Sequence, residues 1–235
     1  MNFFSLFKRQ IFYKLKKKIN IDIDNIKTNS LDELFYHYGS DKADVFRRTG
    51  EKGHGFSNFY SKKLEFFKER NVNILEIGSY AGASAAAFKK YFKKSKIYCL
   101  DINISNFIYS SKDIHVYGLD ICNKKKLYNV LDKIKYEEKL EYFDLIIDDG
   151  SHNLSDILFT FKTLFKHLAK KGIYVIEDFK HPNYYKYNRN IDHILIDQLL
   201  DNLKDKKFFD SSIIENKEQG YFFDNINKIE NFKGN

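Results

Sequence analysis

FDLIIDDGSHN, residues 143–153, is the stretch that decides the fold, together with GIYVIEDF, residues 172–179. Each is a short apolar, β-branched run that ends in carboxylates, a pattern typical of a buried strand. Between them, residues 154–168 repeat apolar side chains at helical spacing. A strand, a crossover helix and a second strand form a right-handed parallel unit in almost every known case. The sequence therefore predicts an α/β fold in which both acidic clusters leave the same edge of one sheet.

Three carboxylates and a histidine follow these two strands: Asp149, Glu177, Asp178 and His152. Neighbouring strands lie about 4.8 Å apart, so the acids can face one another across a gap that fits one hard cation with oxygen ligands at roughly 2.0 to 2.2 Å. Any one of them could instead be structural, because Asp caps helices and tolerates tight turns. Together, at the edge where open α/β sheets bind ligands, they predict a Mg²⁺ or Mn²⁺ site with a titratable base beside it.

The composition fits one α/β domain with an N-terminal extension. The chain has 235 residues, of which 43% are hydrophobic, enough for a sizeable core. Cys99 and Cys122 form no CxxC pattern and indicate reduced core residues of a cytoplasmic protein. No run approaches the roughly 18 apolar residues of a spanning helix, and no signal peptide is evident. We expect a cytoplasmic location, with the inner face of the membrane as an alternative.

The positive charge is concentrated in residues 1–20. The net charge is +8, and six unopposed charges lie in this segment: Lys8, Arg9, Lys14, Lys16, Lys17 and Lys18. The remainder is nearly balanced, so we expect no nucleic-acid partner. One helical face of the segment carries apolar residues: Phe4, Phe7, Ile11, Leu15 and Ile19. This pattern predicts either a helix that lies on an anionic membrane or a helix that docks on its own domain or on a sister subunit of a homo-oligomer.

Three segments follow from these patterns. Residues 1–30 form the basic extension, residues 31–70 a helical cap and lid region, and residues 71–235 the α/β domain with the acidic strand ends. The cap begins with a helix from Leu31 to about Tyr38, which Gly39 ends. The loop over residues 44–58 is polar and rich in glycine, as mobile lids often are.

A strand over residues 72–77 leads into a glycine-rich turn and a helix that begins at Ala83. Gly78 and Gly82 let a ligand approach the backbone at the start of that helix. The next strand ends at Asp101, whose carboxylate can accept both hydroxyls of a ribose. A third strand precedes Asp120. Two β-rich segments, residues 207–214 and 220–223, predict a terminal antiparallel hairpin.

With these pieces in place, residues 31–223 resemble class I S-adenosylmethionine (SAM) dependent methyltransferases, whose Rossmann-like seven-stranded sheet ends in such a hairpin. The general likeness rests on the first glycine-rich turn, on Asp101 and Asp120, and on the two acidic strand ends. YGSDK (residues 38–42), His54 and Tyr60, together with DDGSH and IED, are more narrowly similar to the metal-dependent sugar O-methyltransferases of the macrocin and mycinamicin type.

The resemblance implies a role for each matching residue. The residues at the methionine end of SAM would be Glu76, Gly78, Ser79, Tyr80 and Gly82. Asp101 would bind the ribose hydroxyls and Asp120 the adenine amino group, while Lys42 and Tyr60 would lie in the region that covers the cofactor. Asp149, Glu177 and Asp178 would hold the metal, with His152 as general base. Two departures from the family pattern stand out, since Tyr80 replaces a frequent glycine and Leu119 separates Gly118 from Asp120.

The predicted activity is transfer of a methyl group from SAM to a sugar hydroxyl. A bound divalent cation lowers the pKa of a hydroxyl, and His152 can then take its proton near neutral pH. Asp148 and Asp149 project to opposite faces of their strand, so we expect Asp149 to ligate the metal and Asp148 to support it.

The acceptor is predicted from family analogy alone. We expect the acceptor to be a small molecule or a glycan. The two candidates are a nucleotide-linked sugar, such as an activated heptose, and a surface or capsular polysaccharide. The alternatives are methylation of an aromatic diol, methylation of a phosphate or phosphoramidate oxygen, and a SAM-binding protein without catalysis. A methyltransferase that uses a metal requires a divalent cation for activity, whereas a SAM-binding protein without catalysis does not.

Overall fold

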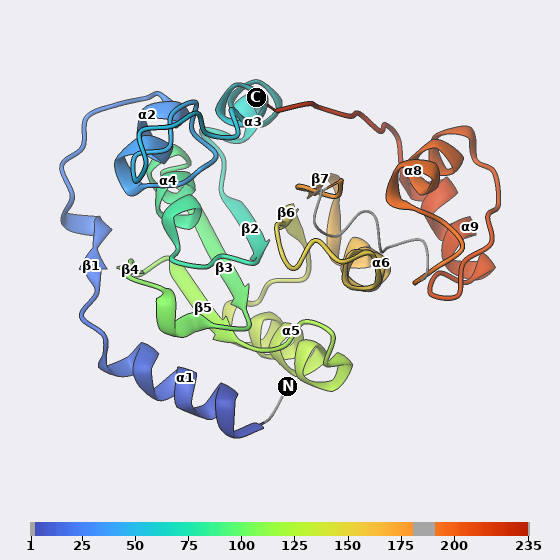
Figure 1. Cartoon of the computed structure of the whole chain (residues 1–235), viewed down its shortest axis with the longest axis horizontal. Coiled ribbons are helices and arrows are strands. Elements are labelled where there is room, and N and C mark those ends of the chain that lie inside the picture. The colour runs from blue at the N-terminus through green and yellow to red at the C-terminus, as the bar shows by residue number, and fades with distance from the viewer. Residues whose placement is uncertain (1–2, 181–190, 235) are drawn as a thin grey trace.

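A parallel five-stranded sheet forms the centre of the protein (Figure 1). The structure, a computed structural model, describes residues 3–180 and 191–234. Along the sheet the strands are β5 (Ile114–Gly118), β3 (Ser95–Asp101), β2 (Val72–Ile77), β6 (Phe143–Asp148) and β7 (Leu168–Ile176), and all neighbours are parallel. The predicted strand, crossover helix and strand are β6, α6 (Leu154–Leu164) and β7. The α/β prediction is confirmed.

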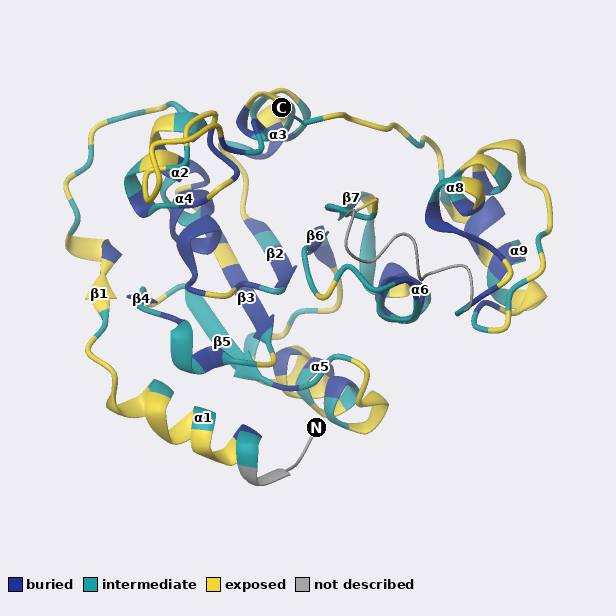
Figure 2. Ribbon diagram, in the orientation of Figure 1, coloured by how far each residue is buried: buried dark blue, intermediate teal, exposed yellow. Residues whose placement is uncertain are grey.

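Helices cover both faces of the sheet because strand residues alternate between the two sides. Ile74 and Ile97 pack in one cluster with α4 (Ala83–Tyr91). Their neighbours Leu75 and Tyr98 pack in a second cluster with α5 (Lys124–Glu138). Figure 2 shows the buried residues of β2 and β3 enclosed between these helices. The central strands are therefore shielded from water on both faces.

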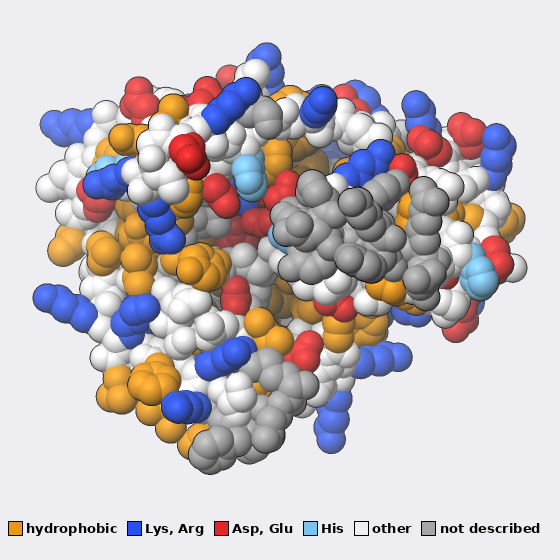
Figure 3. Space-filling view, viewed as in Figure 1, with side chains coloured by type: hydrophobic (Ala, Val, Ile, Leu, Met, Phe, Trp, Pro, Cys, Tyr) orange, Lys and Arg blue, Asp and Glu red, His pale blue; other side chains and the backbone are white. Residues whose placement is uncertain are grey.

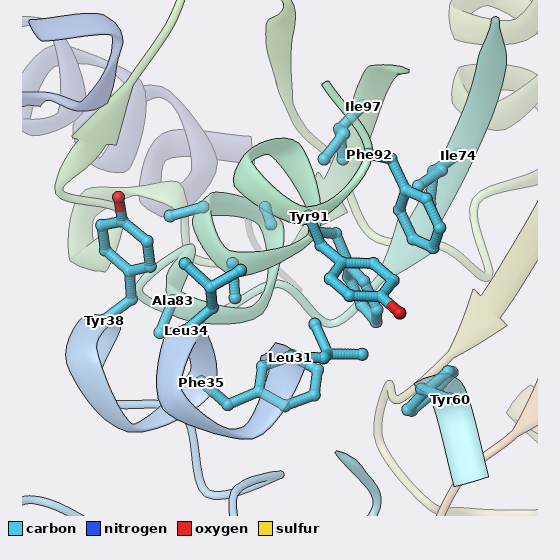
Figure 4. Close-up of a cluster of buried hydrophobic side chains, with 14 of the residues drawn as sticks. Leu31, Leu34, Phe35, Tyr38, Tyr60, Ile74, Ala83, Tyr91, Phe92 and Ile97 are labelled. Carbon is cyan, nitrogen blue, oxygen red and sulfur yellow. The ribbon is translucent and has the colours of Figure 1, made fainter. Parts of the chain in front are cut away.

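The cap region packs on α4. Its helices are α2 (Leu31–Tyr38) and α3 (Ser57–Leu64), so the helix predicted over residues 31–38 is confirmed, ending at Gly39 with a left-handed φ of 76°. Phe88 of α4 receives the edges of Phe35 and Tyr60, with ring centres 5.3 and 5.2 Å away. Figure 4 shows Leu31, Leu34 and Phe35 of α2 on the side of that helix that faces α4. This packing fixes the cap on the domain through α4.

The register of the sheet brings its acidic loops together. The Asp149 N–H donates to the carbonyl oxygen of Ile77 at 3.0 Å, and the Glu177 N–H donates to that of Asp148 at 2.9 Å. The turns after β2, β6 and β7 therefore start side by side. The prediction that both acidic clusters leave one edge is confirmed.

The predicted seven-stranded sheet and its antiparallel hairpin are not found in the described residues. Besides the five-stranded sheet, β1 (Ile19–Asn20) and β4 (Tyr109–Ser110) form a separate parallel pair. Residues 207–214 are irregular, and the predicted strand over residues 220–223 lies inside helix α9 (Asn216–Asn225).

Tertiary packing explains why the terminal segment is helical. The Gln219 side chain donates to the carbonyl oxygens of Phe209 and Ile214, and Phe222, three residues later on the same helical face, contacts Phe161 of α6 at a ring distance of 4.7 Å. A strand would send these two side chains to opposite faces. With α8 (Ile196–Asp205), α9 forms an apolar cluster on α6. The aromatic residues of this segment favoured a strand in the sequence. The structure has a helix there, because only helical spacing brings Gln219 and Phe222 to the same packed face.

Four short 3₁₀ helices complete the described secondary structure: η1 (Ile21–Ile23), η2 (Glu65–Phe67), η3 (Ile104–Asn106) and η4 (Phe165–His167). The N-terminal helix α1 (Phe3–Leu15) contacts η3. Arg9 Nη1 donates to the carbonyl oxygen of Ile102 at 2.8 Å, and the Tyr13 ring meets Phe107 edge-on at 6.4 Å. The alternative in which this segment docks on its own domain is thus confirmed for one face of the helix.

None of the helices in residues 3–180 and 191–234 combines the length and apolar character that a membrane span requires.

Candidate active site

A cleft of about 2320 Å³ runs past the carboxyl ends of the strands. Its walls come from the loop after α2, the turn after β2, the ends of β3, β6 and β7, and the C-terminal residues 224–234. Figure 3 shows carboxylates and a histidine gathered in a hollow near the middle of this face. The cleft therefore opens at the edge where the predicted site residues lie.

Lys42 lies between two of the predicted metal ligands. Its Nζ is 2.6 Å from Asp149 Oδ2 and 2.5 Å from Glu177 Oε2, and the side chain is almost completely buried. Burial by itself would lower the pKa of Lys42, but the Asp149 and Glu177 carboxylates hold that pKa well above its usual value. A charged ammonium thus occupies the position between the acids where a metal ion was predicted.

Tyr60 completes this buried network. Its hydroxyl donates to Glu177 Oε1, the carboxylate oxygen that Lys42 does not reach. We call Lys42, Tyr60, Asp149 and Glu177 the Lys42 network. The cap thereby contributes two side chains that contact the strand-end acids, whereas the resemblance implied contacts with the cofactor. No spacing in the sequence indicated this pairing, because Lys42 and Glu177 are 135 residues apart.

A second group of possible ligands faces the cleft. One ligand atom each from Asp149, His152 and Asp178 lies within 4.8 Å of the others. A hard cation with oxygen ligands at about 2.1 Å spans ligand atoms up to roughly 4.2 Å apart, so small side-chain rotations would close this group around an ion. The two carboxylates fit a divalent cation, and the imidazole of His152 lies beside them. In this arrangement Glu177 is engaged by Lys42 and Tyr60.

Asp148 points away from this group, as its place on the strand predicts. It is buried and accepts a hydrogen bond from the Thr160 hydroxyl of α6. Burial raises its pKa to about 7. Asp148 therefore ties β6 to α6 and supports its neighbour.

Two residues of the site hold a left-handed backbone. The φ angles of His152 and Asp178 are 59° and 49°, a region that non-glycine residues rarely adopt. Such conformations persist where the surrounding structure enforces them and are frequent at functional sites. Here they aim both side chains at Asp149.

Gly78 and Gly82 of the glycine-rich turn both lie against other parts of the protein. A Cβ on Gly78 would lie 1.9 Å from the Asp149 carbonyl oxygen, and a Cβ on Gly82 would meet the Phe107 ring at 2.4 Å. Gly78, Ser79 and Tyr80 also line the cleft. The turn is therefore packed tightly on the loop after β6 and leaves three residues at the surface of the cleft.

Glu76 lies behind that turn in the protein interior. One carboxylate oxygen accepts from the Ser84 hydroxyl at 2.5 Å, and the other has no hydrogen-bond partner in the described part of the chain. Burial raises the pKa of Glu76. An orphaned buried acceptor of this kind fits a cationic donor such as the ammonium of an amino acid.

The two remaining cofactor candidates lie at the other end of the cleft. Asp101 accepts hydrogen bonds from the N–H groups of Tyr80 at 2.7 Å and Asn103 at 2.5 Å. Asp120 also lines the cleft and accepts from the Cys122 N–H at 3.1 Å. Backbone N–H groups thus hold both carboxylates in place at the wall of the cleft. Carboxylates in this position can accept hydrogen bonds from a ribose and from a base.

Comparison with known proteins identifies the class. Residues 75–179 match the family model described as a methyltransferase domain, and this match spans β2 to the end of β7 in the sheet described above. The MycE methyltransferase of the mycinamycin biosynthetic pathway, solved in complex with Mg and SAH, superimposes with a TM-score of 0.66 at 25% identity. That match covers 88% of this chain and 53% of MycE.

The chain is also similar to curated O-methyltransferases. The chain is 30% identical over 132 residues to mycinamicin VI 2''-O-methyltransferase of Micromonospora griseorubida, which is 53% of this chain and 31% of that protein. It is 28% identical over 152 residues to the 8-demethyl-8-alpha-L-rhamnosyl tetracenomycin-C 2'-O-methyltransferase of Streptomyces olivaceus, 62% of this chain and 36% of that protein. The predicted resemblance to the mycinamicin type is confirmed, and the chain spans about a third of the length of these relatives.

Proposed function

We propose that the chain is a SAM- and divalent-metal-dependent O-methyltransferase that acts on a sugar hydroxyl. The observation that carries this proposal is the group of Asp149, His152 and Asp178 in the cleft, beside the Gly78 turn. The similarity to MycE, solved with Mg and SAH, supports the same pair of cofactors.

The proposed metal ligands are Asp149 and Asp178 at the cleft, with Glu177 behind them. When bound there, a divalent cation would lower the pKa of an acceptor hydroxyl and fix its direction. The residues Gly78, Ser79 and Tyr80 would hold the amino-acid end of SAM, with Glu76 beneath them and Asp101 and Asp120 along the nucleoside. Lys42 and Tyr60, which also line the cleft, would support the metal site through their contacts with Glu177.

The chemical step then follows from the position of His152. Bound SAM would supply the methyl group, which would pass to the acceptor oxygen as the sulfur–carbon bond breaks, and the imidazole of His152 would take the hydroxyl proton. Imidazole suits this task because its ordinary pKa lies near neutrality. Lys42 holds the Asp149 carboxylate at the edge of the cleft.

Dependence on a divalent cation is the test of this proposal. We expect methyl transfer from labelled SAM to a panel of sugars to require added Mg²⁺ or Mn²⁺ and to stop when a chelator is present. Asp178→Asn should weaken Mn²⁺ binding in a direct titration, whereas Asp197→Asn, on α8, should leave it unchanged. Full activity in the presence of chelator would refute the metal mechanism.

A nucleotide-linked sugar is the acceptor that we expect. Among the lysines that line the cleft, Lys180 follows the acidic end of β7, and Lys233 lies in the C-terminal segment beside His54 of the cap. A diphosphate has the charge complementary to these two lysines. We expect kcat/KM for a nucleotide-linked sugar to exceed that for the same free sugar at least about tenfold, a gap that closes as salt screens the lysines. Equal kcat/KM values at low salt would contradict this choice of acceptor.

A further inference from the structure

Helix α1 presents two different faces. Leu6, Arg9 and Tyr13 point toward η3, where Leu6 is buried and Arg9 donates to a backbone carbonyl. The opposite face carries four large apolar side chains, with exposed fractions of 53, 42, 52 and 78%: Phe7, Ile11, Phe12 and Leu15. Figure 2 shows this outward side as largely exposed, and Figure 3 shows apolar side chains gathered over α1. We call these four residues the α1 apolar face.

The basic side chains of this segment also fall into two groups, one that contacts the domain and one that is exposed. Lys16 and Lys18 donate to backbone carbonyls of residues 105–107, which helps to hold the segment on the domain. Lys8, Lys14 and Lys17 are exposed beside the α1 apolar face. The first acidic residue of the chain is Asp22. The outward surface therefore combines large apolar groups with unopposed positive charge.

We propose that α1 docks the protein on an anionic lipid bilayer, with the α1 apolar face inserted at the headgroup level. Helices of this composition lie in the plane of a membrane interface, and each lysine near an anionic surface adds to their affinity. A second copy of the chain fits less well, because it would bring like charges together around the contact. The docking contacts with η3 hold the helix in a fixed orientation, so the lipid-facing side is already exposed before binding.

Membrane docking would place the cleft close to the bilayer. Ile102, whose carbonyl receives the Arg9 hydrogen bond, also lines the cleft, as does Asn106 of η3, which accepts from Lys16. The lipid-facing helix and the cleft thus share residues 102–106. This inference rests on α1 alone and holds whichever acceptor the cleft takes.

Vesicle sedimentation with the full chain tests the proposal. We expect the protein to sediment with phosphatidylglycerol–phosphatidylcholine vesicles at least about tenfold more strongly than with pure phosphatidylcholine vesicles. Replacing Lys8, Lys14 and Lys17 by Gln should weaken binding to the anionic vesicles about 100-fold, because each lysine contributes roughly a fivefold factor. The triple variant Phe7→Ser, Ile11→Ser and Leu15→Ser should abolish sedimentation.

The matched control is Phe208→Ser, which removes an equally exposed aromatic residue, 62% accessible, outside α1 and should sediment as the wild type does. Unchanged melting temperatures would show that each variant is folded, since all these side chains point outward. Two outcomes overturn the proposal: no sedimentation of the wild type with anionic vesicles, or a wild-type oligomer in light scattering that the Phe7, Ile11 and Leu15 replacements dissociate.

Discussion

Replacing His152 is expected to lower turnover by roughly 10² to 10⁴-fold, with SAM binding retained, because a positioned general base contributes a factor of this size. The left-handed φ of 59° at this position makes the choice of substitution important. His152→Ala would add backbone strain to the loss of the imidazole. His152→Asn and His152→Gly are the better variants, since both residue types tolerate that conformation.

Both variants should lose turnover alike, while their melting temperatures and their affinities for SAM stay close to wild type. His193→Asn is the matched control, because its side chain is largely exposed on the segment before α8. Calorimetric titration with SAM measures the affinity for SAM, and single-turnover kinetics measure the rate of methyl transfer. Turnover near the wild-type level in His152→Asn would exclude the imidazole as the base.

Lys42→Met should destabilise the protein by about 3–5 kcal/mol, the usual cost of leaving a buried charge without its partner. The change removes the ammonium that contacts both Asp149 and Glu177 and leaves two acids facing each other in the interior. For a chain of this size the loss corresponds to a fall of about 10 °C in melting temperature. Urea unfolding or calorimetry measures the difference.

The control is Lys63→Met, which removes an ion pair with Glu230 in which both side chains are well exposed. Water screens this pair, so we expect Lys63→Met to unfold close to the wild-type midpoint. Added Mg²⁺ should stabilise Lys42→Met more than the wild type, because the divalent cation then meets two acids without a competing ammonium. An unfolding midpoint equal to wild type in Lys42→Met would show that the Lys42 network does not hold the acids together.

Local sequence patterns predicted the elements that depend on local physics. The helix over residues 31–38 could be predicted because Ser30 caps its start, with its hydroxyl accepting from the Glu33 N–H, and Gly39 provides the left-handed residue at its end. The β6, α6 and β7 unit could be predicted from apolar periodicity and the chirality of crossovers. Both predictions rest on interactions within a few residues or on a rule that holds for nearly all such folds.

The terminal segment shows where local patterns fail. Its aromatic residues favour a strand by propensity, yet Phe222 and Gln219 are both buried only in a helix that packs on α6. The same limit applies to α1, whose apolar periodicity predicted a helix but not which face would dock. In the structure Phe7, Ile11 and Leu15 of the predicted apolar face point outward, and Arg9 and Tyr13 make the contact with the domain.

By itself the sequence determined that acids, a histidine and a glycine-rich turn meet at one edge of a parallel sheet, because strand direction and right-handed crossovers leave no other arrangement. Only the tertiary structure decided what lies between those acids. A buried carboxylate takes as its partner whichever cation the packing brings within about 3 Å, and here the cap delivers Lys42 and Tyr60 from more than a hundred residues away. Long-range packing of this kind has no signature in the spacing of residues along the chain.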